Sequence, residues 1–347
     1  MRMKVRTPSD LEMIRSDYRA RQEKYSYRIL VCAGAGCVSS NCHEVRDAVI
    51  DELKRLSLSE QAVVYETGCM GTCAVGPVML ILPERIFYTG LTPESAREII
   101  RAHLTDGRIL EQYTFYDHAL RRHVPQIDDI EFFRHQVRIA LRNCGEIEHA
   151  NIESYIDRDG YAAAAKVLTG MTPLQVVDTI KASGLRGRGG AGFPTGVKWE
   201  AGLRAVSDIK YLVCNADEGD PGAFMDRSII EGDPHTLIEG MIIGGYAIGA
   251  RKGYVYIRAE YPLAVERLKV AIGQARDYGL LGKDLFGSGF DFDMEIRIGA
   301  GAFVCGEETA LMASIEGRRG EPRQKPPFPF EAGLFGKPTI INIVETF

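Results

Sequence analysis

The sequence lacks any apolar run long enough to cross a membrane. Its longest apolar stretch, Met241 to Ala250, is interrupted by glycines and is too short to span a bilayer. The first residues, Met1 to Arg6, are largely basic, but no apolar segment follows them, so the sequence predicts no signal peptide. We therefore expect a soluble, cytoplasmic protein.

The chain has no excess of basic residues either. It carries 42 lysines and arginines against 47 acidic residues, a net charge of -5, so no basic field is available to attract nucleic acid. Hydrophobic residues make up 45% of the chain and charged residues 26%, which is typical of a globular protein. A length of 347 residues indicates two or three domains.

Cysteines are concentrated near the start of the chain, where five of the eight lie between positions 32 and 73. Because no secretory signal is expected, a disulfide framework is not expected either, and the clustering indicates a metal or cluster site. Cys32 and Cys37 form one close pair, and Cys69 and Cys73 form another, each in a loop after an expected strand. Four thiolates on two loops can bind a [2Fe–2S] cluster or a structural zinc ion.

Glycines lie beside the first pair, and their backbone N–H groups can approach the sulfur atoms, which suits an electron-rich cluster. A structural zinc site would more often show spacings of two residues. Ordinary buried thiols are the remaining alternative. Cys42 is a fifth thiol at the start of a helix, and we expect it to have no cluster role. The sequence thus predicts a [2Fe–2S] cluster on Cys32, Cys37, Cys69 and Cys73.

The elements around these cysteines follow a strand–helix–strand–strand–strand–helix order. The apolar pattern predicts strands at Tyr27–Val31, Ala62–Tyr65, Pro77–Leu82 and Ile86–Tyr88, and helices at Val45–Leu56 and Pro93–Leu104. Thr92 is expected to cap the last helix. This order, on about eighty residues, is thioredoxin-like.

Beyond residue 209 the pattern alternates between strands and helices. Strands are expected at Ile209–Cys214, Gly253–Arg258 and Met294–Ile298, with helices at Thr236–Ile248 and Leu263–Tyr278 between them. A βαβαβ series predicts a Rossmann-like parallel sheet covered by helices. The fold class is therefore α/β, with an N-terminal thioredoxin-like domain followed by this domain. Ligands bind such sheets at the carboxyl ends of the strands.

A glycine-rich segment, Gly184 to Trp199, precedes the first of these strands. Gly187, Gly189 and Gly192 match the spacing of the dinucleotide fingerprint, but an expected helix precedes them and Pro194 interrupts the helix that should follow. The segment still offers bare backbone N–H groups beside two arginines and a lysine, which suits a phosphate or a flavin ring system. A flexible surface loop is the alternative.

Two further loops follow expected strands. Asn215 to Gly222 contains three carboxylates, which offer acceptors for ribityl or ribose hydroxyls, although a Ca²⁺ or Mg²⁺ loop or a solvated acidic turn would look similar. Gly299 to Thr309 is rich in small residues and places Glu307 and Glu308 in a first helical turn. Helix capping explains these two acids, whereas the small residues favour close approach of a flat ligand.

Four segments together resemble one known family: Gly184–Trp199, Asn215–Gly222, Gly299–Thr309 and Lys325–Pro329. They resemble the NADH-binding flavoprotein subunit of respiratory complex I, a module also present in NAD-linked hydrogenases, including electron-bifurcating ones, and in NAD-dependent formate dehydrogenases. The resemblance covers residues 135–347. Residues 27–105 resemble the thioredoxin-like [2Fe–2S] domain of the partner subunit, here fused in front. This fusion, and Asp220–Ser228, look more like the hydrogenase and formate dehydrogenase branch.

The resemblance implies an NADH:acceptor oxidoreductase subunit. Hydride transfer between NAD(H) and FMN would be followed by one-electron transfer to iron–sulfur clusters, within a hydrogenase, formate dehydrogenase or complex I-like assembly. Its partners would be a hydrogenase or formate dehydrogenase catalytic subunit and a small [2Fe–2S] subunit. The chemistry occurs on FMN, so no side-chain acid or base is expected. The alternative is a non-catalytic iron–sulfur electron-transfer or docking module that binds nucleotide without turnover.

The resemblance also implies the site residues. Those expected at FMN are Gly187, Arg188, Gly189, Gly190, Lys198, Asn215, Asp217, Glu218, Gly306, Glu307, Glu308, Asn342 and Thr346. Those expected at NADH are Phe193, Glu218, Asp220, Glu308, Lys325 and Phe328. Two positions depart from the family pattern. Ala201 replaces a larger residue that helps to hold the adenine, and Ile343 replaces a second asparagine near the flavin.

We expect four parts: an N-terminal arm over residues 1–26, the [2Fe–2S] domain over 27–105, a linker over 106–135 and an FMN/NADH-binding domain over 136–347. Family members continue from the equivalent of Phe347 into a ubiquitin-like domain and a helical bundle with [4Fe–4S] ligands. No cysteine follows Cys305 here. We therefore expect a fragment or a truncated product, unless another chain completes it, and we expect this chain alone to bind no [4Fe–4S] cluster.

Overall fold

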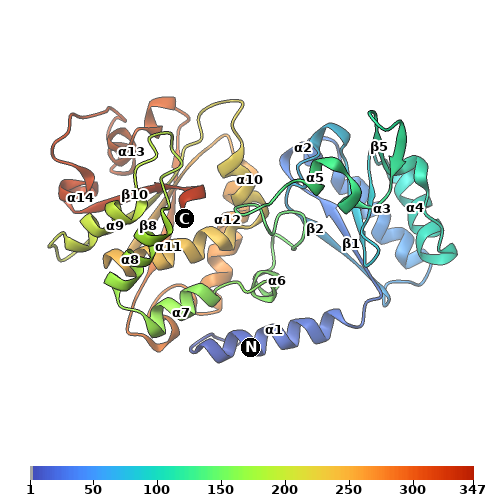
Figure 1. Ribbon diagram of the computed structural model, residues 1–347, viewed down its shortest axis with the longest axis horizontal. Coiled ribbons are helices and arrows are strands. Elements are labelled where there is room, and N and C mark those ends of the chain that lie inside the picture. The colour runs from blue at the N-terminus through green and yellow to red at the C-terminus, as the bar shows by residue number, and fades with distance from the viewer. Residues whose placement is uncertain (1–2) are drawn as a thin grey trace. The chain divides into compact units, whose positions relative to one another are not determined.

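The computed structural model describes residues 3–347 (Figure 1), and the first two residues of the expected N-terminal arm lie outside them. Contacts divide the chain into two compact units. The α/β unit contains the N-terminal residues through Arg15, together with Tyr155–Ile230 and Pro234–Phe347. The thioredoxin-like unit contains Ser16–Ser154 and Glu231–Asp233. Helix α1 (Pro8–Gln22) forms most of the arm.

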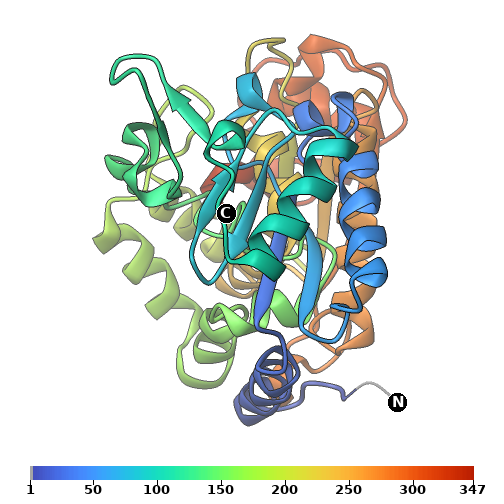
Figure 2. The ribbon, with the colours of Figure 1, turned by 90° about the vertical axis from the view of Figure 1, so that its right-hand side faces the viewer.

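The thioredoxin-like unit is built on a four-stranded sheet in the order β2-β1-β3-β4. The strands are β1 (Tyr27–Cys32), β2 (Ala62–Thr67), β3 (Met79–Leu82) and β4 (Ile86–Tyr88). β1 is parallel to β2 and antiparallel to β3, which is antiparallel to β4. Helices α3 (Cys42–Arg55) and α4 (Pro93–Asp106) pack side by side against the sheet (Figure 2). The predicted thioredoxin-like fold is confirmed.

Local sequence signals fix the ends of α4. The side chain of Thr92 accepts a hydrogen bond from the N–H of Ser95, whose hydroxyl in turn accepts one from the N–H of Thr92. Pro93 follows at the first helical position. Gly107 ends the helix with a φ of +62°, a left-handed conformation that glycine adopts without steric cost.

Residues 106–135 differ from the linker that the sequence predicts. They form an antiparallel pair, β5 (Phe115–Asp117) and β6 (Arg122–Val124), followed by the short helix α5 (Glu131–Arg134). Four apolar side chains of this segment join the buried core of the thioredoxin-like unit: Leu110, Val124, Ile127 and Ile130. Elements of three or four residues are too short to show a period in the sequence, so the pattern alone does not reveal them.

The α/β unit contains a parallel sheet in the order β10-β7-β8-β9. The strands are β7 (Tyr211–Ala216), β8 (Lys252–Arg258), β9 (Asp293–Gly299) and β10 (Thr339–Ile343). The first three follow one another across the sheet as they do in the sequence, and β10 returns to pair with β7. The predicted Rossmann-like parallel sheet is confirmed, with β10 as an additional strand.

Helices cover both faces of this sheet. Helix α13 (Glu308–Ile315) packs on the face that carries Val213 and Tyr254, whereas α11 (Pro234–Ile248) packs on the face that carries Leu212. α11 is buried on nearly all sides, which its apolar sequence allows. The other helices are α6 (Ile152–Asp157), α7 (Ala162–Gly170), α8 (Pro173–Ser183), α9 (Thr195–Arg204), α10 (Met225–Gly232), α12 (Pro262–Asp277) and α14 (Pro329–Ala332).

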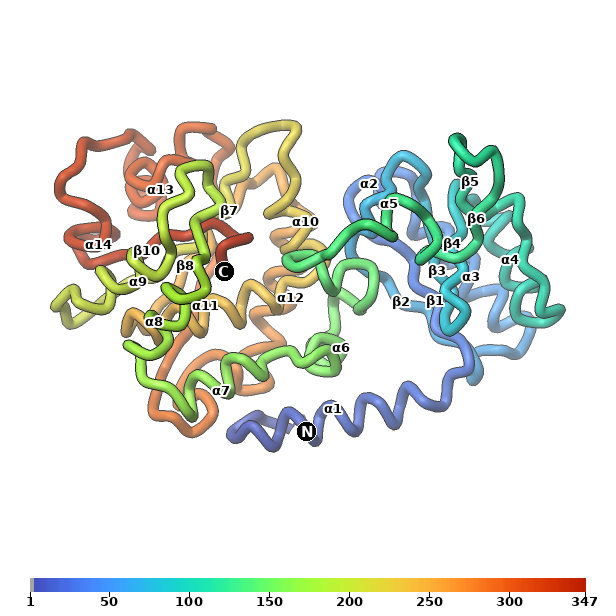
Figure 3. The backbone as a smooth tube through the Cα atoms, viewed as in Figure 1, coloured from blue at the N-terminus to red at the C-terminus, as the bar shows by residue number. Residues whose placement is uncertain are grey.

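The connection between α8 and α9 is the glycine-rich segment, and its backbone can be followed in Figure 3. Helix α8 ends where Gly184 adopts a φ of +70°, and α9 starts directly after Pro194. The segment therefore lies between two helices and not between a strand and a helix. Across residues 3–347, no helix is both long enough and apolar enough to cross a membrane.

Candidate functional site

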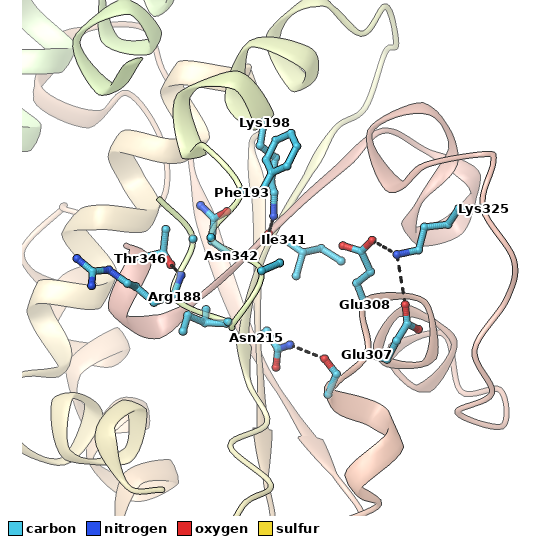
Figure 4. A pocket seen from close by; sticks show the side chains of 16 residues that line it. Arg188, Phe193, Lys198, Asn215, Glu307, Glu308, Lys325, Ile341, Asn342 and Thr346 are labelled. Carbon is cyan, nitrogen blue, oxygen red and sulfur yellow. Dashed lines mark hydrogen bonds and ion pairs between the residues drawn. The ribbon is translucent and has the colours of Figure 1, made fainter. Parts of the chain in front are cut away.

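A cavity of about 400 Å³ opens at the carboxyl ends of β7 and β10 (Figure 4). The chain leaves β7 toward β8 on one side, and β10 pairs with β7 on the other, so the cavity lies where the strand order reverses. Open parallel sheets bind ligands at such a point. The cavity is lined by Gly187, Arg188, Gly189, Ala191, Gly192, Phe193, Lys198, Asn215, Gly306, Glu307, Glu308, Lys325, Ile341, Asn342, Ile343 and Thr346.

The glycine-rich segment forms one wall of the cavity. Its two arms are joined by a hydrogen bond of 2.8 Å from Gly187 N to Phe193 O and one of 2.9 Å from Thr195 N to Leu185 O. At the tip, Gly190 has a φ of +97°, which a residue with a side chain adopts only under strain. The segment is thus a closed loop with a fixed base and a tip that requires glycine.

Gly189 leaves the cavity wall free of a side chain. A Cβ built on Gly189 would meet nothing closer than the side chain of Ile343, at 3.4 Å. Such a Cβ would therefore take up space at the cavity wall without clashing with the protein. A backbone without side chains at the edge of an open cavity suits a planar ring system or a phosphate.

Lys198 and Asn342 place polar groups on neighbouring parts of the wall. Lys198 Nζ donates a hydrogen bond of 2.9 Å to the carbonyl oxygen of Ile341, and burial holds the pKa of Lys198 below its usual value. With its amide oxygen toward Trp199, Asn342 accepts a hydrogen bond of 2.9 Å from the indole N–H. A partly dehydrated ammonium group is better satisfied by an anionic ligand than by a carbonyl alone.

Asn215 and Thr346 connect the loops around the cavity. Asn215 Nδ2 donates a hydrogen bond of 2.9 Å to Gly306 O, and its Oδ1 accepts one of 3.0 Å from Asp217 N. Thr346 Oγ1 accepts a hydrogen bond of 3.2 Å from the N–H of Arg188. These bonds hold the glycine-rich segment and the ends of β7 and β10 around one space.

Charged side chains occupy another part of the wall. Glu307 Oε2 accepts hydrogen bonds from the N–H groups of Thr309, at 2.8 Å, and Ala310, at 3.0 Å, and so caps α13. Burial alone would raise the pKa of Glu307, but the bonds from Thr309 and Ala310 hold it below its usual value. Lys325 forms an ion pair with Glu308, and its Nζ lies 3.5 Å from Glu307. Glu307 thus fulfils the capping role and also faces the cavity.

Five expected site residues do not line this cavity: Gly190, Asp217, Glu218, Asp220 and Phe328. The carboxylate of Glu218 accepts hydrogen bonds from the N–H groups of Met225, at 2.7 Å, and Arg227, at 3.1 Å, so it caps α10. This contact orders the loop after β7 and engages the side chain that was expected at the ligand.

Asp217 is buried behind the cavity wall, with 2% of its side chain exposed. Its Oδ1 lies 3.6 Å from Arg258 Nε, and its Oδ2 has no hydrogen-bond partner within the described part of the chain. Burial raises the pKa of Asp217 to about 6, although the Arg258 charge opposes this shift. An unsatisfied buried carboxyl oxygen is costly, which is consistent with a polar ligand group near it.

Asp220 and Phe328 lie at the surface. Asp220 Oδ1 accepts a hydrogen bond of 3.0 Å from Gly222 N and closes the acidic turn. Phe328 stacks on Phe330, with ring centroids 5.6 Å apart and planes 3° from parallel. Because 44% of Phe328 is exposed, its ring remains accessible to a ligand.

Four residues of this region are missing from the sequence-based set. Ala191, Gly192 and Ile341 line the cavity. Arg258 lies behind it, where its guanidinium donates hydrogen bonds of 3.2 Å to the carbonyl oxygens of both Glu218 and Gly301. Arg258 is the last residue of β8, so its position at the carboxyl end of an expected strand could have identified it from the sequence. No feature of the sequence identifies Ile341 as a site residue, because the pairing of its strand, β10, with β7 is not evident from the sequence.

The four predicted cluster cysteines come together in the thioredoxin-like unit. Cys32 ends β1 and Cys37 lies in the short helix α2 (Ala35–Ser39), while Cys69 and Cys73 follow β2. The sulfur atoms of Cys69 and Cys73 are 3.7 Å apart. The thiol of Cys32 is hydrogen-bonded to those of Cys37 and Cys69, and the bond with Cys37 raises the pKa of Cys32 to about 11.

Glycines allow the loops to approach these sulfur atoms. A Cβ on Gly76 would lie 3.0 Å from Cys37 Sγ, and one on Gly36 would lie 3.1 Å from Cys73 Sγ. Within residues 3–347, no group of three His, Cys, Asp or Glu side chains is arranged to hold a single metal ion. A [2Fe–2S] cluster needs two thiolates for each of its two iron atoms, a number that these four thiols can supply. Cys42 is fully buried at the start of α3.

The fold and these two sites have the features of an iron–sulfur flavoprotein of the α/β class. Residues 180–347 match the family model of the Nuo51 FMN-binding domain, and residues 16–104 match that of the thioredoxin-like [2Fe-2S] ferredoxin. Each of the two parts of the chain thus matches the domain family that its sequence resembles. The expected FMN and [2Fe–2S] cofactors are confirmed as those of the two domain families.

Several known proteins are similar to this chain. NADP-reducing hydrogenase subunit HndC of Solidesulfovibrio fructosivorans is 66% identical over 212 residues, or 61% of this chain and 43% of its own length. The alpha subunit of the NAD-reducing hydrogenase HoxS of Cupriavidus necator is 38% identical over 98% of this chain and 55% of its own length. A crystal structure of an NAD⁺-reducing [NiFe]-hydrogenase in the H₂-reduced state aligns with 98% of this chain and 57% of its own, at 26% identity and a TM-score of 0.52. The chain thus spans about half the length of these relatives.

Proposed function

We propose that this chain is an NADH:acceptor oxidoreductase subunit that passes electrons between NAD(H), FMN and iron–sulfur clusters. The observation that carries the proposal is the cavity at the reversal of the strand order, which combines a side-chain-free glycine wall with Lys198 and Asn215. Such a wall suits the isoalloxazine ring, and the polar side chains suit its ribityl phosphate.

FMN would be held by the glycine-rich segment, Lys198, Asn215, Asn342 and Thr346. When bound, FMN accepts a hydride as an electron pair and releases the electrons singly. The protein's own task is to orient and to bind. Lys198 would exchange the Ile341 carbonyl for an anionic oxygen, or share its N–H donors between the two. The hydrogen bonds of Asn215 and Thr346 fix the surrounding loops before a ligand arrives, which lowers the entropic cost of binding.

NAD(H) would bind over the same cavity, near Phe193, Glu308, Lys325 and Phe328. Lys325 can neutralise pyrophosphate charge, and Phe328 offers an aromatic face to the adenine. In the protein as it stands, Lys325 is paired with Glu308, so nucleotide binding would have to rearrange this ion pair. Ala201 does not line this cavity. It lines a second cavity of about 490 Å³, together with Phe330.

The [2Fe–2S] cluster would be bound by Cys32, Cys37, Cys69 and Cys73 within a domain of residues 27–105. We place the FMN/NADH-binding domain at residues 136–347. The partners would be redox subunits of a hydrogenase, formate dehydrogenase or complex I-like assembly in the cytoplasm. The relatives named as hydrogenase subunits support an assembly of this kind.

An anaerobic visible spectrum tests the proposed function. The purified chain, with its FMN and iron quantified, should bleach its flavin absorbance near stoichiometrically when NADH is added. Iron–sulfur absorbance without any response to NADH would instead identify a non-catalytic electron-transfer or docking module. A chain that binds neither FMN nor iron would refute both functions.

A further inference from the structure

The segment Glu231–Asp233 belongs to the thioredoxin-like unit, although its neighbours in the sequence belong to the α/β unit. Glu231 is 3% exposed and Asp233 is 2% exposed. Asp233 Oδ2 accepts a hydrogen bond of 2.8 Å from Asn143 Nδ2. Burying two carboxyl groups within three residues costs free energy unless each is hydrogen-bonded, so the contacts of this segment are specific.

Glu231 contacts the loop that carries the first pair of cysteines. Its Oε2 accepts a hydrogen bond of 3.2 Å from the N–H of Ala35. Ala35 is the first residue of α2 and lies between Cys32 and Cys37 in the sequence. A carboxyl group is thereby fixed against the backbone that connects two of the proposed cluster ligands.

Gly232 contacts the loop that carries the second pair. A Cβ built on Gly68 would lie 2.3 Å from Gly232 Cα, and one built on Gly232 would lie 2.4 Å from Cys144 Sγ. The missing side chain of Gly68 thus allows the two backbones to come this close, and that of Gly232 leaves room for the side chain of Cys144. Since Gly68 directly precedes Cys69, both cysteine loops are in contact with the segment 231–233.

We propose that Glu231 is a positioning residue for the [2Fe–2S] cluster and that its buried carboxylate lowers the reduction potential of that cluster. The inference rests on the proposed placement of the cluster on the four paired cysteines. Reduction adds one negative charge to the cluster, and a fixed negative charge nearby opposes it. Burial strengthens this repulsion, because little water lies between the two charges to screen them.

Glu231→Gln tests the charge directly, because glutamine keeps an oxygen that can accept the N–H of Ala35. In the purified full chain, the ratio of reduced to oxidised cluster at a fixed potential should rise about tenfold, or about 59 mV for a one-electron couple. The EPR g values should stay the same. The control is Glu52→Gln, which removes a carboxylate that is also 3% exposed and that contacts Arg55 in α3 and Arg101 in α4. An unchanged potential in Glu231→Gln, or an equal shift in Glu52→Gln, would overturn the proposal.

Ala35→Pro separates the effect of the hydrogen bond between Glu231 and Ala35 from the effect of the Glu231 charge. Proline removes the N–H donor and is tolerated in a first helical turn, while the carboxylate of Glu231 remains. We expect altered g values and a smaller change in potential than in Glu231→Gln. If the Glu231→Gln variant loses its cluster, Ala35→Pro becomes the deciding test. Wild-type g values together with a wild-type potential in Ala35→Pro would then overturn the proposal. A wild-type chain without any [2Fe–2S] EPR signal would instead refute the proposed function.

Discussion

Lys198 and Ile341 are joined by a hydrogen bond of 2.9 Å from the ammonium group to the backbone carbonyl, which connects α9 to β10 at the cavity wall. If Lys198 also binds the flavin, Lys198→Met should weaken FMN binding by about 10- to 100-fold, since a charge-assisted hydrogen bond contributes about 1.5–3 kcal/mol. Titration of the flavin-free protein with FMN measures the effect. Lys337→Met is the control, because Lys337 pairs only with Asp208 at the surface in the contacts observed, and equal affinities in the two variants would contradict the prediction.

Gly189→Val should give a folded protein that contains little flavin. The added side chain would enter the cavity, where its first carbon meets only Ile343 at ordinary contact distance. Flavin content per chain, together with the thermal unfolding temperature, separates loss of binding from loss of folding. The matched control is Gly273→Val, where the added carbon meets nothing within 4 Å. Stoichiometric FMN in Gly189→Val would show that the loop does not form the flavin site.

Cys69→Ser should remove or strongly alter the low-temperature EPR signal of the cluster. Cys69 lies 3.7 Å from Cys73 and is hydrogen-bonded to Cys32, so it occupies a central place among the four thiols. Cys42→Ser is the control and should leave the signal nearly unchanged. Iron analysis of the wild-type chain should give about two atoms, the content of one [2Fe–2S] cluster. One equivalent of zinc without iron, or loss of the signal in Cys42→Ser, would refute this ligand set.

Phe328→Ala should raise the apparent KM for NADH severalfold without a change in flavin content. Its ring is 44% exposed and stacked on Phe330, so removing it eliminates an aromatic surface without opening the core. Steady-state kinetics with an artificial electron acceptor provide the measurement. Phe335→Ala serves as the comparison, since Phe335 is also half exposed but packs against Tyr211, with ring centroids 5.7 Å apart, and not against Phe330. The same KM in wild type and Phe328→Ala would count against the proposed nucleotide site.

Asp226 should make stability decline as the pH rises. Burial, followed by the nearby charge of Glu218, raises the pKa of Asp226 from 3.8 to about 7. The folded state therefore binds this proton more tightly than the unfolded state, so its contribution is complete below pH 3.8 and is lost as the pH rises through 7. Asp226→Asn should flatten this part of the profile and stabilise the protein at pH 8. Each tenfold difference in proton affinity between the two states corresponds to about 1.4 kcal/mol.

Urea unfolding from pH 4 to pH 8 measures this slope. Asp208→Asn is the control, because Asp208 is exposed and its pKa is lowered by the hydrogen bond from Lys337. Parallel stability profiles for wild type and Asp226→Asn would contradict the prediction.

The residues that determine the two domain folds could be identified from the sequence because their signals are local. Helix α4 begins at Pro93 as predicted, since Thr92 caps it and Pro93 occupies its first position. The paired cysteine spacings and the glycine-rich segment are likewise short patterns that chance seldom produces together. The β5–β6 pair and strand β10 were not predicted, because these short segments show no clear hydrophobic periodicity.

The sequence pattern alone determined that this protein has a thioredoxin-like domain, a parallel α/β domain, paired cysteines and a glycine-rich segment. Only the tertiary structure decided which side chains share a space. It sets Glu218 at the start of α10 and not at the cavity, and it places Ile341 in the cavity wall. It also sets Glu231 against Ala35, which is 196 residues away in the sequence. The physical reason is that strand pairing and close backbone approach bring distant residues together, and the local order of amino acids does not specify which distant segments will meet.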